Sequence, residues 1–583
     1  MKRRLALSLL PLSLLTLGFG QCSKRPVQIW QVNRSIPGYV EPNTPGAPGV
    51  SIPAKIAALL GEDANLNRVS YVKTFPVTLK RPRTIVIFIP GFLGGATTFD
   101  PLARDLVAAG NERLQVWSVD RRPNQLEDQL GGLHAEQALE TGDPTAIFEG
   151  AQFYFPDTDL PPVDNFPGPE DLDINLDGVL DPQLPLVDDM GVERLPILFE
   201  QDDVRFLGSW GIDLYMRDWK RLVEKARRVV GRNGLVVLGG HSQGTGWASI
   251  FAAYDFDPGP GVEAGYELID GLILLEGGGV RPSSNPPPTA AEYVQQVADL
   301  TTPGGPDVFL QDLILGGIPV LSLTDLGTIG QVASIAAVAD PDAPAVIQRT
   351  PVLGLGLIGV LLRAPATNLT VAGLFLDDDF SPNPAFRATI GFSDNGPNLF
   401  GVFGPVYWAF PDPGGALRSW KNFDDPTLPV CPPSTPGDGT GCAINLTTDP
   451  GDREVSDINT FLRTQYEVNN GFEWYFLSGR VSLDFSYGND SSSLGDESLL
   501  AITQNANVDI PVLGIGGTNG LARSEASFDT YFGSIATPAG DKKAVILPGY
   551  AHVDPLVADQ NEALPLILDF MDQIRSGASP VFP

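Results

Sequence analysis

The stretch that most constrains this chain is the turn Gly240-His241-Ser242-Gln243-Gly244. It follows a short apolar run at 235–238, which predicts a buried strand, and it precedes an alanine-rich segment that predicts a helix. On such a strand-to-helix turn the serine hydroxyl is lifted above the end of a sheet, and the glycines avoid a clash that a Cβ would cause. The alternative is an ordinary glycine-rich turn capped by a serine, and the position between strand and helix favours the first interpretation.

Composition sets the class of protein. The 583 residues exceed a single ordinary core, and 43% hydrophobic against 19% charged residues indicates a compact globular chain with one large elaborated domain or two. The net charge is −32, and no basic cluster is visible along the sequence after the first 25 residues. Nucleic acids and anionic membrane surfaces are therefore poor partners, and the acidic surface is best explained by solubility.

Strands and helices are expected to alternate on both sides of the turn, which predicts an α/β fold with a mostly parallel sheet and helices on both faces. Strands are expected at 84–89, 114–119, 235–238, 271–276, 508–516 and 544–552, with one or two early strands in 69–80. Helices are expected near 99–109, 208–230 and 562–574. The predicted organisation is a signal peptide (1–22), an extended leader (23–67), a core (68–278) with an insertion at about 125–207, an inserted lid or cap (279–504) and the end of the core (505–583).

The N-terminus predicts export. Three cationic residues at 2–4 precede an apolar stretch of signal-peptide length, and no later stretch is long enough to span a bilayer. Cys22 stands where a bacterial lipoprotein carries its lipid, although Gln21 occupies a position where a small residue is usual, and simple cleavage near Gly20 is the alternative. We expect a periplasmic, outer-membrane-anchored or extracellular protein, with a disulfide between Cys431 and Cys442.

The first insertion contains an acidic loop at 171–181. Oxygen-bearing side chains at alternate positions followed by Gly178 are typical of a calcium loop, with candidate ligands Asp173, Asn175, Asp177 and Asp181. Leu184 stands where an EF-hand has its glutamate, so Asp188 or Asp189 would have to complete the coordination. The alternative is a solvated acidic loop. A calcium ion here would be structural, and no cofactor is expected for catalysis.

Ser242 needs a base, and the chain has three histidines. His241 precedes the serine and is directed away from it, whereas His134 lies in the first insertion, where no strand end delivers it. His552 follows the last expected strand, in a loop that would hang over the serine, and is therefore the candidate base. The alternative to this role is a surface-loop histidine.

The base needs a carboxylate to orient it, and the turn after the 508–516 strand offers Asn519 where an acid would be expected. Glu276, at the end of the strand that follows the helix after Ser242, is favoured as the orienting acid. The alternative is that it caps the next segment. Behind it stand Glu525, Asp509 and Asp554. The backbone amides of Gln243 and Phe92, the latter in a Pro90-Gly91-Phe92 turn, are candidate donors to an oxyanion.

These residues resemble the α/β-hydrolase superfamily, and within it secreted bacterial lipases and esterases. The resemblance is carried by the Pro90-Gly91-Phe92 turn, the Gly-His-Ser-Gln-Gly turn and the late His552, and it covers about 55–278 and 505–583. It implies an α/β-hydrolase fold, oxyanion donors at Phe92 and Gln243, and in some relatives a structural calcium. Two positions depart from the pattern: proline precedes Gly91 where histidine is usual, and Asn519 occupies the usual acid position.

We expect an exported serine hydrolase that cleaves carboxylic esters with an apolar acyl chain, because an apolar lid would line an acyl pocket. Three rivals share the sequence evidence: an acyltransferase, an amidase or peptidase, and a non-catalytic binding protein on a hydrolase scaffold. The first two would use the same residues, and the third gains support from the amide at Asn519.

Overall fold

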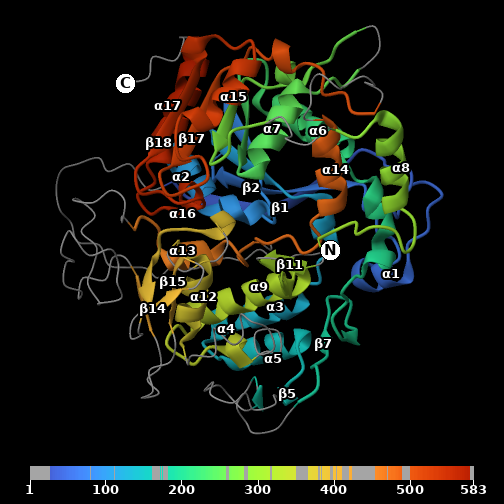
Figure 1. Cartoon of the computed structure of the whole chain (residues 1–583), viewed down its shortest axis with the longest axis vertical. Helices are drawn as coiled ribbons and strands as arrows, with labels where there is room; N and C mark the ends of the chain where they lie inside the picture. Colours follow the sequence, from blue (N-terminus) through green and yellow to red (C-terminus); the bar gives the residue numbers. More distant parts are fainter. Residues whose placement is uncertain are drawn as a thin grey trace, which may run out of the picture.

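The computed structural model is organised around one eight-stranded sheet (Figure 1). The residues that it describes are 27–78, 80–110, 112–159, 171–172, 174, 181–257, 261–280, 287–310, 312–315, 318–349, 366–378, 381, 384–393, 398–401, 404–409, 419–422, 454–468, 471–488 and 499–577. No described helix is long and apolar enough to cross a membrane.

The strand order of the sheet is β1-β2-β4-β3-β9-β10-β17-β18. Within it, β2 is antiparallel to both of its neighbours, and all the other neighbouring pairs are parallel. The expected mostly parallel sheet is confirmed, and two strands have the bounds predicted for them, β3 and β4. The strands are β1 (Ile29–Pro37), β2 (Arg68–Pro76), β3 (Thr84–Ile89), β4 (Leu114–Val119), β9 (Leu235–His241), β10 (Gly271–Leu275), β17 (Val512–Gly517) and β18 (Lys542–Leu547).

Helices cover both faces of the sheet, as predicted. In β3 the side chains of Ile85, Ile87 and Ile89 enter one hydrophobic cluster, and those of Val86 and Phe88 enter the other, because successive side chains of a strand point to opposite faces. The first cluster is completed by α6 (Ile212–Val230), α7 (Gln243–Ala253) and α15 (Ala526–Ser534). The second is completed by α2 (Asp100–Ala109) and α17 (Ala563–Ser576).

The segment predicted as an extended leader contributes one strand to the sheet. Its residues Ile29–Pro37 form β1, which pairs antiparallel with β2 along its whole length, and α1 (Ala54–Leu60) follows. β1 is an edge strand with a partly exposed side-chain pattern, so it lacks the apolar run that identifies the central strands.

The two insertions form one cap. Helix α9 of the second insertion packs against α3, α4 and α5 of the first, and these helices lie together in the lower half of Figure 1. The described elements outside the sheet and its flanking helices are α3 (Leu130–Ala135), α4 (Gln137–Thr141), α5 (Thr145–Tyr154), β5 (Thr158–Asp159), β6 (Asp171–Leu172), β7 (Leu186–Val187), β8 (Glu193–Arg194), α8 (Ala290–Leu300), β11 (Asp312–Leu315), β12 (Ile318–Ser322), α9 (Leu323–Ala339), α12 (Asn368–Leu376), β13 (Gly391–Ser393), β14 (Asn398–Gly401), β15 (Gly404–Ala409), β16 (Trp420–Asn422), α13 (Ile458–Arg463), α14 (Ser478–Gly488) and α16 (Asp554–Val557).

Candidate active site

Ser242 stands alone between the last residue of β9 and the first of α7. Its backbone has φ 55° and ψ −124°, a conformation that an L-residue adopts only when its surroundings impose it. The surroundings are tight: a Cβ on Gly240 would lie 2.0 Å from the Gly244 carbonyl oxygen, and one on Gly244 would lie 2.2 Å from that of Ile89. The spacing of the glycines therefore follows from the turn itself, which presents the serine at the N-terminus of α7.

His552 reaches this turn from the loop after β18. The Nδ1 atom of its buried ring donates to Glu276 Oε2 over 3.0 Å. Its backbone carbonyl accepts a 2.8 Å hydrogen bond from Nε2 of His241, the residue before Ser242, and the two imidazole centroids are 4.6 Å apart. With the proton on Nδ1, the lone pair is on Nε2, which is buried and has no hydrogen-bond partner among the described residues.

Glu276 follows β10 directly and is fully buried. Besides His552, its carboxylate accepts from the backbone N–H groups of Gly517, Leu521 and Ala522. These donors come from the end of β17 and the turn after it, the turn in which Asn519 stands where an acid was expected. A Cβ on Gly520 would lie 2.2 Å from Glu276 Oε2, so this turn closes tightly around the carboxylate.

Burial sets the protonation of the pair. It lowers the pKa of His552 below that of a free imidazole, so the ring is neutral at neutral pH. Burial also raises the pKa of Glu276, while the backbone donors of Leu521, Ala522 and Gly517 pull that pKa down. A neutral imidazole with a free Nε2 and an oriented Nδ1 is the state in which histidine can accept a proton.

The other carboxylates considered for this position lie elsewhere. Glu525 and Asp509 are exposed. Asp554 is buried, but its oxygens accept hydrogen bonds from Ser456, Thr389 and the Ala551 amide. His134 is also remote from the turn, since Nε2 of its ring lies 2.5 Å from Glu149. Of these candidates, the structure brings only Glu276 against the His552 ring.

The turn that carries Phe92 packs against the serine. A Cβ on Gly91 would lie 2.8 Å from the Cβ of Ser242, so only glycine permits this approach. Neither the Phe92 amide nor that of Gln243 donates a hydrogen bond within the part of the chain that the structure describes. Two unused backbone donors beside a serine can bind the oxyanion of a tetrahedral intermediate.

Arg121, which sequence reasoning missed, holds this turn in place. Its buried guanidinium donates to the carbonyls of Pro90, Gly91 and Gly94 at 3.0, 2.7 and 3.0 Å and pairs with the buried carboxylate of Glu473 at 2.6 Å. Glu473 belongs to the second insertion, and its amide donates to the Leu93 carbonyl. No local pattern in the sequence links two residues 352 positions apart.

The predicted calcium loop falls mostly outside the described residues, as do Asp173, Asn175 and Asp177. Asp181 is described, and its amide donates to Asp157. Asp188 accepts from the Met190 and Val192 amides and contacts Arg194. Cys22, Cys431 and Cys442 also lie outside the described residues. One described carboxylate cluster could hold a metal ion by its geometry, namely Asp377, Asp378 and Glu454.

Comparisons with known proteins give structural neighbours only. No family model and no curated protein matches the chain. The similar solved structures include a putative lipase from Sulfolobus solfataricus (12% identity, 88% of this chain and 91% of that chain covered, TM-score 0.39). They also include an epoxide hydrolase from Vigna radiata (11%, 88% and 96%, TM-score 0.32) and a thermophilic esterase from Thermogutta terrifontis (10%, 88% and 96%, TM-score 0.32).

The sequence identities and TM-scores of these structures are too low to carry an argument, so the fold is assigned from the strand order of this chain. Its second strand is antiparallel within an otherwise parallel eight-stranded sheet, the third and fourth strands exchange places, and a strained serine turn follows the fifth. A histidine after the last strand reaches this turn. This connectivity is that of the α/β-hydrolase fold.

Proposed function

We propose that this protein is an exported serine hydrolase that cleaves carboxylic esters with apolar acyl groups through an acyl-enzyme intermediate. The observation that carries the proposal is the buried chain from Glu276 through His552, whose Nε2 has no partner among the described residues and whose ring packs against His241, the residue before the strained Ser242. A serine hydroxyl becomes a useful nucleophile only with a base in this state.

In the proposed reaction, Ser242 Oγ attacks the ester carbonyl while His552 Nε2 takes its proton. The resulting oxyanion is bound by the amides of Phe92 and Gln243, and Glu276 stabilises the imidazolium. The proton passes to the departing alkoxide, which leaves as the alcohol. Water then attacks the acyl-serine with the same base, and the acid is released as Ser242 regains its proton.

The preference for apolar acyl groups is supported by the aromatic residues beside the oxyanion turn. The ring of Phe92 meets that of Phe476, from the cap, edge to face at 4.8 Å between centroids. Phe472, also from the cap, packs with Phe386. Aromatic walls with few polar groups are typical of sites that bind apolar ligands.

Export is proposed from the basic and apolar N-terminal segment, which lies outside the described residues. Its test is the N-terminal sequence of protein recovered from the cell envelope and the medium. A mature chain that begins near residue 22 agrees with the proposal, and an intact Met1 in protein that stays in the cytoplasm contradicts it.

The catalytic proposal is tested by labelling the purified mature protein with a fluorophosphonate. We expect labelling of the wild type and none of Ser242→Ala, together with hydrolysis of p-nitrophenyl esters that improves with acyl length. The matched control is Ser249→Ala, because Ser249 lies on α7 and donates to the Thr245 carbonyl, away from the site. No labelling of the wild type, with detergent present to open the cap, would refute the enzyme and favour a binding protein.

The same preparation separates the catalytic rivals. Added alcohol competes with water for the acyl group. Faster formation of the new ester than of the free acid would identify an acyltransferase. Faster cleavage of an anilide than of the matching ester would identify an amidase.

A further inference from the structure

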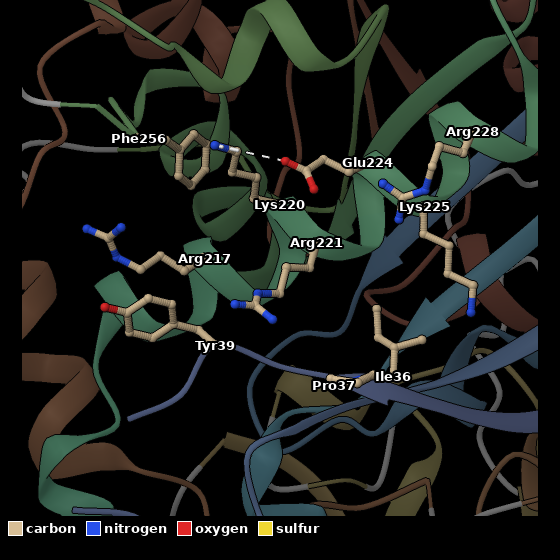
Figure 2. A pocket seen from close by; sticks show the side chains of 10 residues that line it. All are labelled: Ile36, Pro37, Tyr39, Arg217, Lys220, Arg221, Glu224, Lys225, Arg228 and Phe256. Atoms are coloured by element: carbon tan, nitrogen blue, oxygen red, sulfur yellow. Dashed lines mark ion pairs between the residues drawn. The ribbon is translucent and has the colours of Figure 1, made fainter. Parts of the chain in front are cut away.

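A cationic pocket lies between the outer face of α6 and the end of β1 (Figure 2). Its volume is about 580 Å³, within the range of small-molecule sites, and five of its ten lining residues are cationic while one, Glu224, is acidic. None of them belongs to the candidate active site. The lining residues are Ile36, Pro37, Tyr39, Arg217, Lys220, Arg221, Glu224, Lys225, Arg228 and Phe256.

The cations form a stripe along one helix. Arg217, Arg221, Lys225 and Arg228 are spaced by four, four and three residues, which places them on one side of α6 in successive turns. Asp218 interrupts them in the sequence, but it is buried on another side of the helix and pairs with Arg122 at 2.6 Å. The expectation that no basic cluster follows residue 25 is therefore wrong, because helical spacing gathers cations that acidic residues separate in the sequence.

Most of this positive charge is not neutralised by the protein. Arg217 pairs with Asp213, and Lys220 pairs with Glu263 at 2.6 Å. Arg221, Lys225 and Arg228 have no ion pair among the described residues. This is unexpected in a chain with 70 acidic against 38 basic residues.

The neighbouring strands add to the positive potential. Burial lowers the pKa of Lys73 on β2, and the nearby charges of Arg34 and Lys225 lower it further. Arg34 and Lys225 therefore repel the Lys73 ammonium. A bound anion would relieve this repulsion.

Aromatic rings pack against the two cations of the pocket that have ion-pair partners. The Arg217 guanidinium lies 5.2 Å from the ring centroid of Tyr39, and the Lys220 ammonium lies 5.0 Å from that of Phe256. Ile36 and Pro37 complete an apolar part of the wall, and Figure 2 shows the side chains of Arg221 and Arg228 without such a partner. The pocket therefore combines fixed walls with free cationic donors.

We propose that this pocket binds a ligand that carries two or more phosphate groups. Three unpaired cations on successive turns, with the Cβ atoms of neighbouring ones about 5–6 Å apart, suit a ligand with several phosphates, whereas a single carboxylate would neutralise only one of them. The planar donors of Arg221 and Arg228 suit phosphate oxygens. The phosphates can belong to a free phosphorylated compound or to a lipid headgroup.

The probe is inorganic tripolyphosphate, titrated into the mature protein by calorimetry at about 50 mM salt, where screening is weak. We expect saturable binding by the wild type and a Kd raised about tenfold or more in Arg221→Gln/Arg228→Gln, since removal of each charge-assisted hydrogen bond weakens binding by roughly that factor. Arg232→Gln is the matched control: it removes an exposed charge just beyond α6 and outside the pocket, and we expect its Kd to change less than twofold.

A second arm identifies the source of the phosphates. Vesicles of phosphatidylcholine with and without cardiolipin, an anionic lipid that carries two phosphates, are sedimented with each variant. The pocket binds lipid headgroups if the wild type sediments only with vesicles that contain the anionic lipid, if the double variant does not sediment, and if added tripolyphosphate prevents sedimentation. Tripolyphosphate binding without vesicle binding assigns it to a free compound. No binding of either probe by the wild type, or equal binding by wild type and double variant, overturns the proposal.

Discussion

Replacing Arg121 by lysine tests whether one side chain sets the shape of the oxyanion turn. The arginine donates to three carbonyls of that turn and to Glu473 at once. A lysine keeps the charge, but its three donors diverge from a single nitrogen, so it can hold Glu473 and one carbonyl and must release the others.

The magnitude follows from the hydrogen bonds that a lysine cannot make. At least two charge-assisted hydrogen bonds disappear, each worth about 1.5–3 kcal/mol, which is enough to let the Phe92 amide move out of position. Removal of one oxyanion donor lowers kcat about 10²- to 10³-fold. We therefore expect Arg121→Lys to lower kcat about 100-fold, with KM changed only a few-fold.

Glu473→Gln is the complementary change, because it leaves the arginine on the turn but removes its counter-charge. An unpaired buried charge costs about 3–5 kcal/mol of folding free energy, so we expect a clear fall in Tm and a smaller reduction of kcat. Arg480→Lys is the control: Arg480 is also buried, donates to the Gly208 carbonyl and pairs with Asp484 at 2.8 Å, away from the turn. It should lower Tm and leave kcat unchanged.

The assay measures ester hydrolysis per active site, with sites counted by fluorophosphonate titration and folding followed by thermal melting. Wild-type kcat in folded Arg121→Lys would refute the reasoning, because the turn would then keep its shape without the guanidinium. An equal reduction of kcat in Arg480→Lys would mean that any buried arginine matters, and would refute it as well.

Three further predictions concern the acid and the base. Glu276→Gln turns an amide NH₂ toward the Gly517 N–H and should lower kcat about 10³-fold or more while the protein stays folded; near-normal kcat would exclude Glu276 as the orienting acid. In a pH profile of kcat/KM, protonation of His552 should reduce activity only well below pH 6.5, since the base works unprotonated and burial lowers the pKa of His552. Burial raises the pKa of Glu276 to about 7, so an acid limb near 7 that is absent from Glu276→Gln reports the acid, whereas a limb at or above 6.5 that persists in that variant contradicts the prediction. Gly520→Ala should push Glu276 aside and lower kcat, whereas Gly533→Ala, in open space on α15, should leave kcat unchanged and raise Tm slightly; equal kcat in both would argue against the close fit.

Local sequence patterns were sufficient to predict the strands that are buried on both faces. The bounds of β3 could be predicted because Ile85–Ile89 is a continuous apolar run, and those of β4 because apolar residues dominate it although Gln115 and Ser118 interrupt them. The serine turn carries its own glycines, and Glu276 could be favoured because it ends the strand next to the serine's strand. β1 could not be predicted, since its edge position leaves it with mixed polar and apolar side chains.

Interactions between distant segments could not be predicted. Arg121 and Glu473 are 352 positions apart in the chain, and neither residue stands in a recognisable motif. The pocket on α6 includes Tyr39 and Phe256 from other segments, and the strongly acidic composition of the whole chain gives no sign of its cations. These features depend on three-dimensional spacing, which a pattern along the sequence does not encode.

The strand-like pairing between the cap and the oxyanion turn limits how the protein could open. Gly94 bridges to Phe472, the Gly95 amide donates to Gly471, and Glu473 holds Arg121. A shortened chain that replaces 279–504 by a linker would therefore lose these contacts to the oxyanion turn as well as its cover. The contacts tie residues 471–473 to that turn, so an opening motion that carried these residues away with the cap would have to break them.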